Sequence, residues 1–222
     1  MENKTITQDE VQILKTLMEG REKITILDIG AADLSHSVQF RNVFPDARIY
    51  AVEPDINYQA QNLHFSRMFQ IEYSPCLLSG QEGEVRFYPS TTYEGYTGNK
   101  SLWAGSGSIY KPNKEFIDKN YPTLEFDTEG YEVCSYTFDG FCRSRNIDKI
   151  DYLHIDVQGA EYEILKDATI LPDYIFAEIS DFETYHSNTN RENWEYMLYQ
   201  KGYVLIAEDE ANALYLKATK IF

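Results

Sequence analysis

The first 80 residues alternate between apolar runs and amphipathic segments, and this order constrains the fold more than any other feature. The runs over 24–29 and 48–52 are almost uninterrupted, which is typical of strands buried on both faces. Helices are predicted over 35–43 and 57–69, and a third strand over 72–78. Strands that alternate with helices form βαβ units, so the sequence predicts a parallel sheet.

The C-terminal third resumes this alternation. The last two strands are joined by a short linker, so they are expected to pair antiparallel. We therefore predict an α/β, Rossmann-like fold in which a mostly parallel seven-stranded sheet ends in an antiparallel edge hairpin. A single domain is expected over 1–222, with an N-terminal helix over 8–20. The predicted C-terminal helices are 138–144, 159–168 and 191–200, and the strands are 152–157, 174–179, 203–206 and 213–216.

Composition limits the partners and the compartment. The 222 residues include 20 basic and 36 acidic side chains, for a net charge of -16. Such a surface repels phosphate backbones, so no nucleic-acid partner is expected. Three cysteines without C-x-x-C spacing (Cys76, Cys134 and Cys142) fit buried thiols in a reducing compartment better than disulfides or a zinc site. The polar start and the lack of an 18-residue apolar run predict a cytoplasmic protein with no signal peptide or membrane span.

Carboxylates stand at the ends of three predicted strands, where open α/β sheets bind their ligands: Asp28, Glu53 and Asp156. Gly30 directly after the first strand allows close backbone approach to a ligand. Glu53 follows about 25 residues later, where an acidic group can accept both hydroxyls of a ribose. Residues 30–35 hold one glycine rather than G-x-G-x-x-G, which favours an adenosine-containing cofactor without a pyrophosphate. The alternative is a tight turn in which Asp28 is purely structural.

Four segments resemble the FkbM family of S-adenosylmethionine-dependent methyltransferases. The most specific is IDYLHIDVQGAEYEILK at 150–166, similar to the family's DFLKIDVEGAELEVLK, and three others support it: TILDIGA at 25–31, VEPD at 52–55 and LSGQEGEVRFY at 78–88. The resemblance covers roughly residues 24 to 217. It implies a class I methyltransferase fold that moves a methyl group to a hydroxyl of a sugar, glycan or related small metabolite.

The resemblance also implies cofactor-binding positions. The residues expected to line S-adenosyl-L-methionine are Asp28, Gly30 and Ala31 at the methionine half, Glu53 with Pro54 at the ribose, and Leu78 with Ser79 at the adenine. Four positions in two of these motifs depart from the family pattern. Its GANxG reads GAADL at 30–34, and its KIDVEG carries His154 for lysine and Gln158 for glutamate.

Catalysis is expected on the acceptor side. Asp156 is predicted to act as base or orienter for a weakly nucleophilic hydroxyl, the alternative being a helix cap. Glu178, at the end of the next strand, could join Asp156 in holding a divalent cation or could cap a loop. His186, in a loop leaving a carboxyl end, is the imidazole candidate, and the alternative is a surface histidine. His154 is expected to be a satisfied core residue.

The stretch 90–133 breaks the periodicity and is rich in tyrosine, of which the chain has 18. A loop this long inside a compact domain is usually functional or disordered, and the aromatic load argues against disorder. We predict an inserted lid that binds the acceptor, with Tyr96, Trp103 and Ser108 as contacts. The alternative is that its tyrosines pack on the sheet or form a homo-oligomer interface.

Two other functions remain open from the sequence. A nicotinamide-dependent oxidoreductase can use the same sheet, although the missing glycines disfavour it. A non-catalytic carbohydrate-binding or assembly protein can retain the fold, because fold alone does not establish activity.

Overall fold

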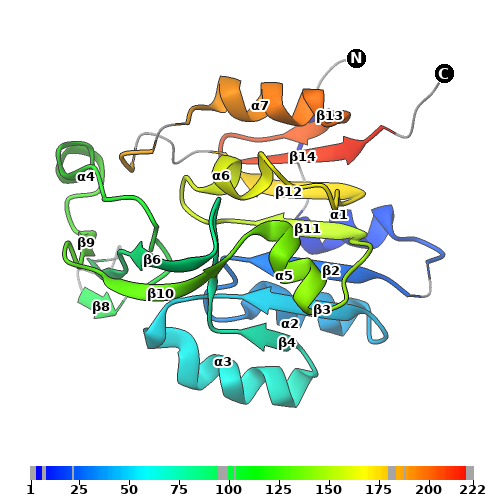
Figure 1. Cartoon of the computed structure of the whole chain (residues 1–222), viewed down its shortest axis with the longest axis horizontal. Coiled ribbons are helices and arrows are strands. Elements are labelled where there is room, and N and C mark those ends of the chain that lie inside the picture. Colours follow the sequence, from blue (N-terminus) through cyan, green and yellow to red (C-terminus); the bar gives the residue numbers. More distant parts are fainter. Residues whose placement is uncertain are drawn as a thin grey trace.

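A mixed sheet forms the centre of the computed structural model, which describes residues 4–6, 9–21, 23–94, 100–102, 104–179, 184–187 and 189–218 (Figure 1). Across the sheet the strands run in the order β1 (Lys4–Thr5), β13 (Tyr203–Glu208), β14 (Asn212–Lys217), β12 (Tyr174–Glu178), β11 (Tyr152–Ile155), β2 (Thr25–Ile29), β3 (Arg48–Val52) and β4 (Glu72–Ser74).

The strand directions confirm the predicted fold. From β4 to β12 every neighbouring pair is parallel, whereas β14 pairs antiparallel with both β12 and β13. Seven strands therefore form the mostly parallel sheet with an antiparallel C-terminal hairpin. The eighth strand, β1, pairs parallel with the outer side of β13 and has two residues, too few for a periodic signal.

Helices cover both faces of this sheet (Figure 1). On one face, apolar side chains of the first three helices pack in a core cluster with Ile26, Ile49 and Tyr152: α1 (Glu10–Leu17), α2 (Ser35–Val43) and α3 (Ile56–Phe69). On the other face, three later helices pack in a second cluster with Leu27 and Leu153: α5 (Phe138–Ser144), α6 (Glu161–Leu165) and α7 (Arg191–Gln200). Alternate residues of each strand thus belong to opposite clusters, as a two-residue period requires.

Two elements differ from the sequence-based expectation. The strand predicted over 72–78 is interrupted at Pro75, which has no N–H for a sheet ladder, and resumes as β5 (Leu77–Leu78) in a different sheet. The helix predicted over 159–168 begins only at Glu161, since Gln158 and Gly159 have positive φ angles of 56° and 93°.

The stretch 90–133 contributes strands to two small sheets and does not form an unstructured loop. In Figure 1 they lie on the side toward which the parallel strands point. β5, β10 (Tyr131–Tyr136) and β6 (Gly83–Phe87) form one small sheet, and β8 (Lys100–Leu102), β7 (Ser90–Glu94) and β9 (Glu125–Phe126) form another. The helix α4 (Lys114–Asn120) completes the segment. These elements have two to seven residues, which is too short for hydrophobic periodicity to predict them.

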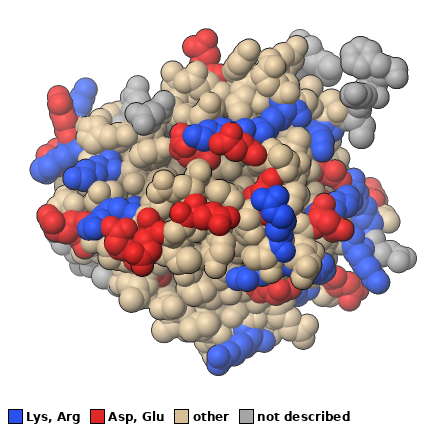
Figure 2. Space-filling view, in the orientation of Figure 1, with Lys and Arg blue, Asp and Glu red and all other residues tan. Residues whose placement is uncertain are grey.

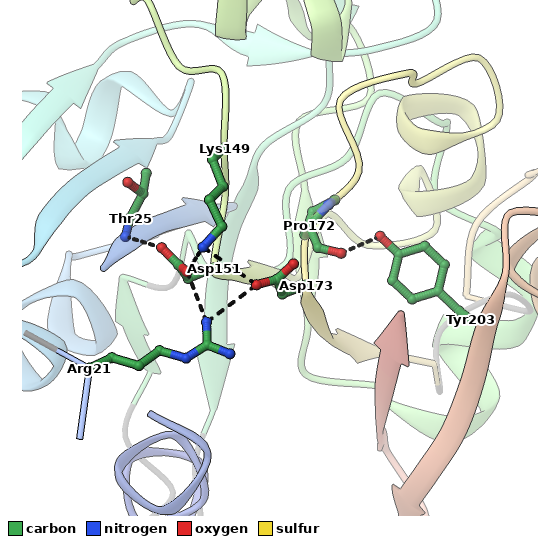
Figure 3. Close-up of polar contacts among 7 residues, drawn as sticks. All are labelled: Arg21, Thr25, Lys149, Asp151, Pro172, Asp173 and Tyr203. Carbon is green, nitrogen blue, oxygen red and sulfur yellow. Dashed lines mark hydrogen bonds and ion pairs between the residues drawn. The ribbon is translucent and has the colours of Figure 1, made fainter. Parts of the chain in front are cut away.

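A cluster of paired charges closes the opposite end of the sheet, where β2, β11 and β12 begin (Figure 3). The buried Asp151 carboxylate accepts hydrogen bonds from the Arg21 guanidinium at 2.9 Å, the Lys149 ammonium at 2.5 Å and the Thr25 N–H at 2.9 Å. Arg21 also binds Asp173 at 3.2 Å. The cluster therefore joins residues that lie 130 and 152 positions apart in the chain.

The surface is mixed in charge on the face shown in Figure 2, where acidic and basic side chains alternate in small groups. Within the described residues, no helix combines the length and apolar character that a membrane crossing requires. All three cysteines are free thiols; Cys76 and Cys142 are buried as expected, but Cys134 is exposed. The expectation was wrong for Cys134 because this residue faces outward from β10 in the small sheet.

Candidate active site

A cavity lies at the carboxyl ends of β2, β3 and β11. The residues that line it come from the strand ends, from β5 and β6, and from the insertion: Ile29, Gly30, Ala32, Val52, Glu53, Pro54, Leu77, Leu78, Phe87, Ala104, Gly105, Gly107, Ser108, Ile109, Asp156, Val157, Gln158 and Ala160. The insertion thus forms one wall, and the sheet edge forms another.

The turn after β2 brings two strand ends into close contact. Gly30 has a φ of 80°, and a Cβ at this position would lie 1.7 Å from the carbonyl oxygen of Asp156. Only glycine fits such a position. Ala32 and Leu34 follow with φ angles of 42° and 65°, at the two positions where the family's GANxG pattern carries asparagine and glycine. The departures from that pattern therefore fall where the backbone itself favours asparagine or glycine.

Glu53 forms the wall at the end of β3. Its carboxylate accepts the N–H of Ala32 on Oε2 at 2.9 Å and the N–H of Asp55 on Oε1 at 2.7 Å. Burial raises the pKa of Glu53 to about 8, although both backbone hydrogen bonds act in the opposite direction. Each oxygen retains a lone pair that can accept a ribose hydroxyl, so this residue fits the role expected for it.

On the side of the cavity where adenine is expected, the wall is apolar, and the hydroxyl of Ser79 makes its hydrogen bonds outside the cavity. Pro54, Leu78 and Phe87 line the cavity beside Glu53, which suits a flat heterocycle. Ser79 does not line it. Its hydroxyl lies 2.8 Å from the Ser135 hydroxyl, and its N–H is bound to the Tyr136 carbonyl. Leu78 therefore lies at the cavity as expected, whereas the polar groups of Ser79 serve the small sheet.

Asp28 lies on the other face of the sheet, directed toward α2. Its carboxylate accepts the Ser37 hydroxyl at 2.5 Å and Nδ1–H of His154 at 2.8 Å. Burial alone would raise the pKa of Asp28, but the hydrogen bond from His154 lowers it below its ordinary value. Neither Asp28 nor Ala31 is among the described residues that line the cavity. Of the three residues expected at the methionine half, Gly30 therefore lines the cavity, and Ala32 lines it in addition.

Asp156 and Glu178 are brought together around one amide. The side-chain nitrogen of Gln158 donates to Asp156 Oδ1 at 2.6 Å and to Glu178 Oε2 at 2.7 Å. Asp156 also shares a hydrogen bond with the Glu178 carboxyl. Burial raises the pKa of Asp156, and these hydrogen bonds oppose the rise. The amide nitrogen thus stands between the two carboxylates that were expected to hold a cation, and metal binding at this pair stays a prediction.

The remaining predicted residues have different positions. Ser108 lines the cavity and donates its hydroxyl to the Gln158 carbonyl at 2.8 Å. His186 is exposed, is not among the described cavity residues, and donates its N–H to the Lys111 carbonyl. Tyr96 and Trp103 lie outside the described residues. Of the acceptor contacts named from the sequence, Ser108 is therefore the one that the structure places in the cavity wall.

Sequence reasoning missed two polar residues behind this wall. The hydroxyl of Tyr185 lies 2.9 Å from Gln158 Oε1 and 2.6 Å from the Ser106 carbonyl. The buried Glu161 accepts the N–H of Val157, and burial raises its pKa to about 7. The signal that could have located these residues was Gln158, because it departs from the family motif at the end of a strand.

The sheet order, the glycine turn after β2 and the carboxylate after β3 are the arrangement of the class I methyltransferase fold. Residues 28–205 match the family model described as the Methyltransferase FkbM domain, so the chain belongs to the FkbM methyltransferase family. S-adenosyl-L-methionine is accordingly the methyl donor. This assignment decides against the nicotinamide-dependent oxidoreductase that the sequence alone left open.

Two relatives support the family and the fold. The 2-O-methyltransferase NoeI of Sinorhizobium fredii (strain NBRC 101917 / NGR234) is 30% identical over 179 residues, which cover 77% of this chain and 68% of the relative. A crystal structure of a methyltransferase FkbM from Methylobacillus flagellatus KT matches with a TM-score of 0.51 at 13% identity. That match covers 88% of this chain but 44% of the other, so this chain spans less than half of that protein's length.

Proposed function

We propose that the protein transfers the methyl group of S-adenosylmethionine to a hydroxyl oxygen of a sugar, a glycan or a related small metabolite. The observation that carries this proposal is that Glu53 and Asp156 line the same cavity from the ends of β3 and β11, the two strands that flank β2. One carboxylate suits the cofactor's ribose, and the other suits an acceptor hydroxyl. The 2-O-methyltransferase relative supports oxygen as the acceptor atom.

The chain's own residues mainly align the reactants. The cofactor supplies a methyl group on a positively charged sulfur, which is already a good electrophile. Holding an acceptor oxygen in line with such a group can contribute about 7–11 kcal/mol. Asp156, whose pKa is raised by burial, is suited to accept the hydroxyl proton, an effect worth roughly 10²–10⁴-fold in rate. Gln158 orients Asp156 through its amide.

The insertion supports an acceptor of limited size. Its segment from Ala104 to Ile109 lines the cavity, and Ser108 is tied to the Gln158 carbonyl behind Asp156. This position supports the expected role of the insertion as a lid over the acceptor. The net charge of -16 fits a small neutral acceptor better than a polyanion.

Turnover with hydroxylated acceptors tests this proposal. The purified protein is incubated with S-adenosylmethionine and a panel of mono- and oligosaccharides, and formation of S-adenosylhomocysteine is measured. Asp156→Asn should lower kcat by roughly 100-fold with cofactor affinity within about twofold, because the amide cannot accept the proton. Asp148→Asn, an exposed carboxylate on the approach to β11, is the matched control.

Three results would contradict parts of the proposal. Wild-type turnover in Asp156→Asn removes this residue from the mechanism. Turnover with amines but not with hydroxyls contradicts oxygen as the acceptor. Cofactor binding without turnover on any acceptor favours a non-catalytic carbohydrate-binding or assembly protein.

A further inference from the structure

Three polar side chains meet on the face of the sheet that carries α1 and α2, away from the cavity. Glu10 begins α1, His36 lies in the first turn of α2, and His154 is on β11. One ligand atom of each, a carboxylate oxygen or a ring nitrogen, lies within 4.8 Å of those of the other two. We refer to these residues as the Glu10–His36–His154 cluster.

The spacing in this cluster suits a small metal ion. His154 Nε2 and Glu10 Oε2 are 3.6 Å apart. Two ligands of a tetrahedral zinc ion with bonds of about 2.0–2.1 Å stand roughly 3.3 Å apart, so little movement is needed. The His36 and His154 rings meet edge to face with centroids 4.7 Å apart. Since His36 is exposed at the helix surface, its side chain can turn toward the pair, and an ion can enter there.

The far side of the His154 ring is already arranged as in a metal-binding histidine. Nδ1–H donates to the fully buried Asp28 carboxylate at 2.8 Å, which leaves Nε2 facing Glu10. Metal-ligating histidines almost always donate their second ring N–H to such a group, which fixes the tautomer. Glu10 is held in the same way, because its Oε1 accepts the Tyr152 hydroxyl at 2.9 Å.

Two buried carboxylates, Glu10 and Asp28, stand on either side of the His154 ring. Buried charges are normally paired or coordinate a metal. A divalent ion bound by Glu10 and His154 would pair with both carboxylates.

We propose that the Glu10–His36–His154 cluster binds one Zn²⁺ ion, with water at the fourth position on the exposed side of His36. One carboxylate and two imidazole ligands, completed by a water molecule, match the tetrahedral coordination of this ion. The ion joins α1 and α2 to the central strand β11. Its role is to hold the N-terminal helix on the sheet, and it takes no part in methyl transfer.

Metal titration of the untagged protein tests the site independently of activity. After dialysis against EDTA, Zn²⁺ is added and both stoichiometry and thermal unfolding are followed. We expect one equivalent to bind and the Tm to rise by about 5–10 °C at an ion concentration 100-fold above Kd. Co²⁺ in place of Zn²⁺ should give the visible absorption of a tetrahedral site. No uptake and no rise in Tm would overturn the proposal and leave the cluster as an ion-paired histidine.

Variants locate the binding. His36→Ala removes an exposed ligand, so the metal-free protein should keep its Tm while zinc affinity falls at least tenfold. Glu10→Gln, which retains an acceptor for Tyr152, should weaken binding similarly. His64→Ala removes another exposed helical histidine outside the cluster and should leave binding unchanged. If His36→Ala still binds one equivalent of Zn²⁺ tightly, the proposal is contradicted. This test holds even if Glu10→Gln fails to fold.

Discussion

The two ends of the central sheet use carboxylates in opposite ways. At the amino ends of the strands, Asp151 and Asp173 bind Arg21 and Lys149 in a closed set of ion pairs (Figure 3). At the carboxyl ends, the hydrogen bonds to Glu53 and Asp156 come from backbone N–H groups, an amide and another carboxyl group. The pKa of Asp151 is lowered, while those of Glu53 and Asp156 are raised.

The comparison separates carboxylates that stabilise the fold, at the amino ends of the strands, from carboxylates that line the cavity, at the carboxyl ends. Cationic partners hold Asp151 ionised, and the resulting pairs tie β2, β11 and β12 together. Glu53 and Asp156 are buried without that compensation, so part of the folding free energy is given up to keep acceptors at a cavity. The backbone follows the same division, because Gly30, Ala32 and Gln158 line the cavity with positive φ angles.

The largest effect is expected from Gly30→Ala. The new Cβ would lie 1.7 Å from the Asp156 carbonyl oxygen, so the strand ends must separate. We expect a loss of about 3 kcal/mol or more in unfolding free energy, together with loss of cofactor binding. Gly20→Ala is the matched control: its φ is 77°, but nothing lies within 4 Å of the new Cβ. It should cost about 1 kcal/mol. Equal costs, measured by urea unfolding, would contradict the close approach.

Asp151→Asn should break the amino-end cluster and leave the cavity intact. Although burial acts in the opposite direction, the hydrogen bond from Lys149 holds the pKa of Asp151 below its ordinary value. Its contribution is therefore present above about pH 4 and is lost as the pH falls through the lowered pKa. We expect about 2 kcal/mol lower unfolding free energy at pH 7, with unchanged cofactor affinity. Weakened cofactor binding would show that the two ends are coupled.

Glu53 should make cofactor binding depend on pH. Both ribose hydroxyls need an ionised acceptor, and burial raises the pKa of Glu53 to about 8. Affinity for S-adenosylhomocysteine should therefore rise about 25-fold from pH 6.5 to 8.5, because the ionised fraction of a carboxyl group with a pKa of about 8 grows by that factor. Glu53→Gln should bind more weakly with a flat profile. A flat profile in the wild type would contradict this role.

The same raised pKa predicts how stability depends on pH. Protonation of Glu53 favours the folded state, so its contribution is fully present below about pH 4.5 and is lost as the pH rises through about 8. Glu53→Gln removes this loss. Its unfolding free energy relative to the wild type should thus increase with pH, as measured by urea unfolding at pH 5 and pH 9.

The smallest effect is expected from Ala32→Gly, which probes backbone strain beside the cavity. Ala32 has a φ of 42°, a conformation that costs an alanine about 1 kcal/mol relative to glycine. We expect a gain of up to about 1 kcal/mol in unfolding free energy. A loss of stability would mean that the turn is not strained at this position.

Much of the fold could be predicted from the sequence because buried parallel strands appear as continuous apolar runs. Short elements could not be predicted in this way. The strand Lys4–Thr5 has only two residues, and after the interruption at Pro75 the chain continues in another sheet. The insertion's strands pair with segments distant in the chain, for example Tyr131 with Phe87, and such register leaves no local pattern.

The site was predictable wherever a residue follows a strand end. Gly30, Glu53 and Asp156 line the cavity for this reason. Asp28 does not, because it precedes the strand end by one residue and the two-residue period turns its side chain to the other face. The environment of Gln158 could not be predicted, since it depends on the register between β11 and β12. The contact between Glu10 and His154 could not be predicted either, because it depends on how α1 packs on the sheet.

Titration with S-adenosylhomocysteine tests most directly whether the carboxyl end of the sheet is the cofactor site. The wild type, Glu53→Gln and Asp151→Asn are compared by calorimetry at pH 8. The account predicts micromolar binding by the wild type, at least tenfold weaker binding by Glu53→Gln from loss of the paired ribose hydrogen bonds, and wild-type affinity in Asp151→Asn. No binding by the wild type, or equal binding by Glu53→Gln, would contradict it.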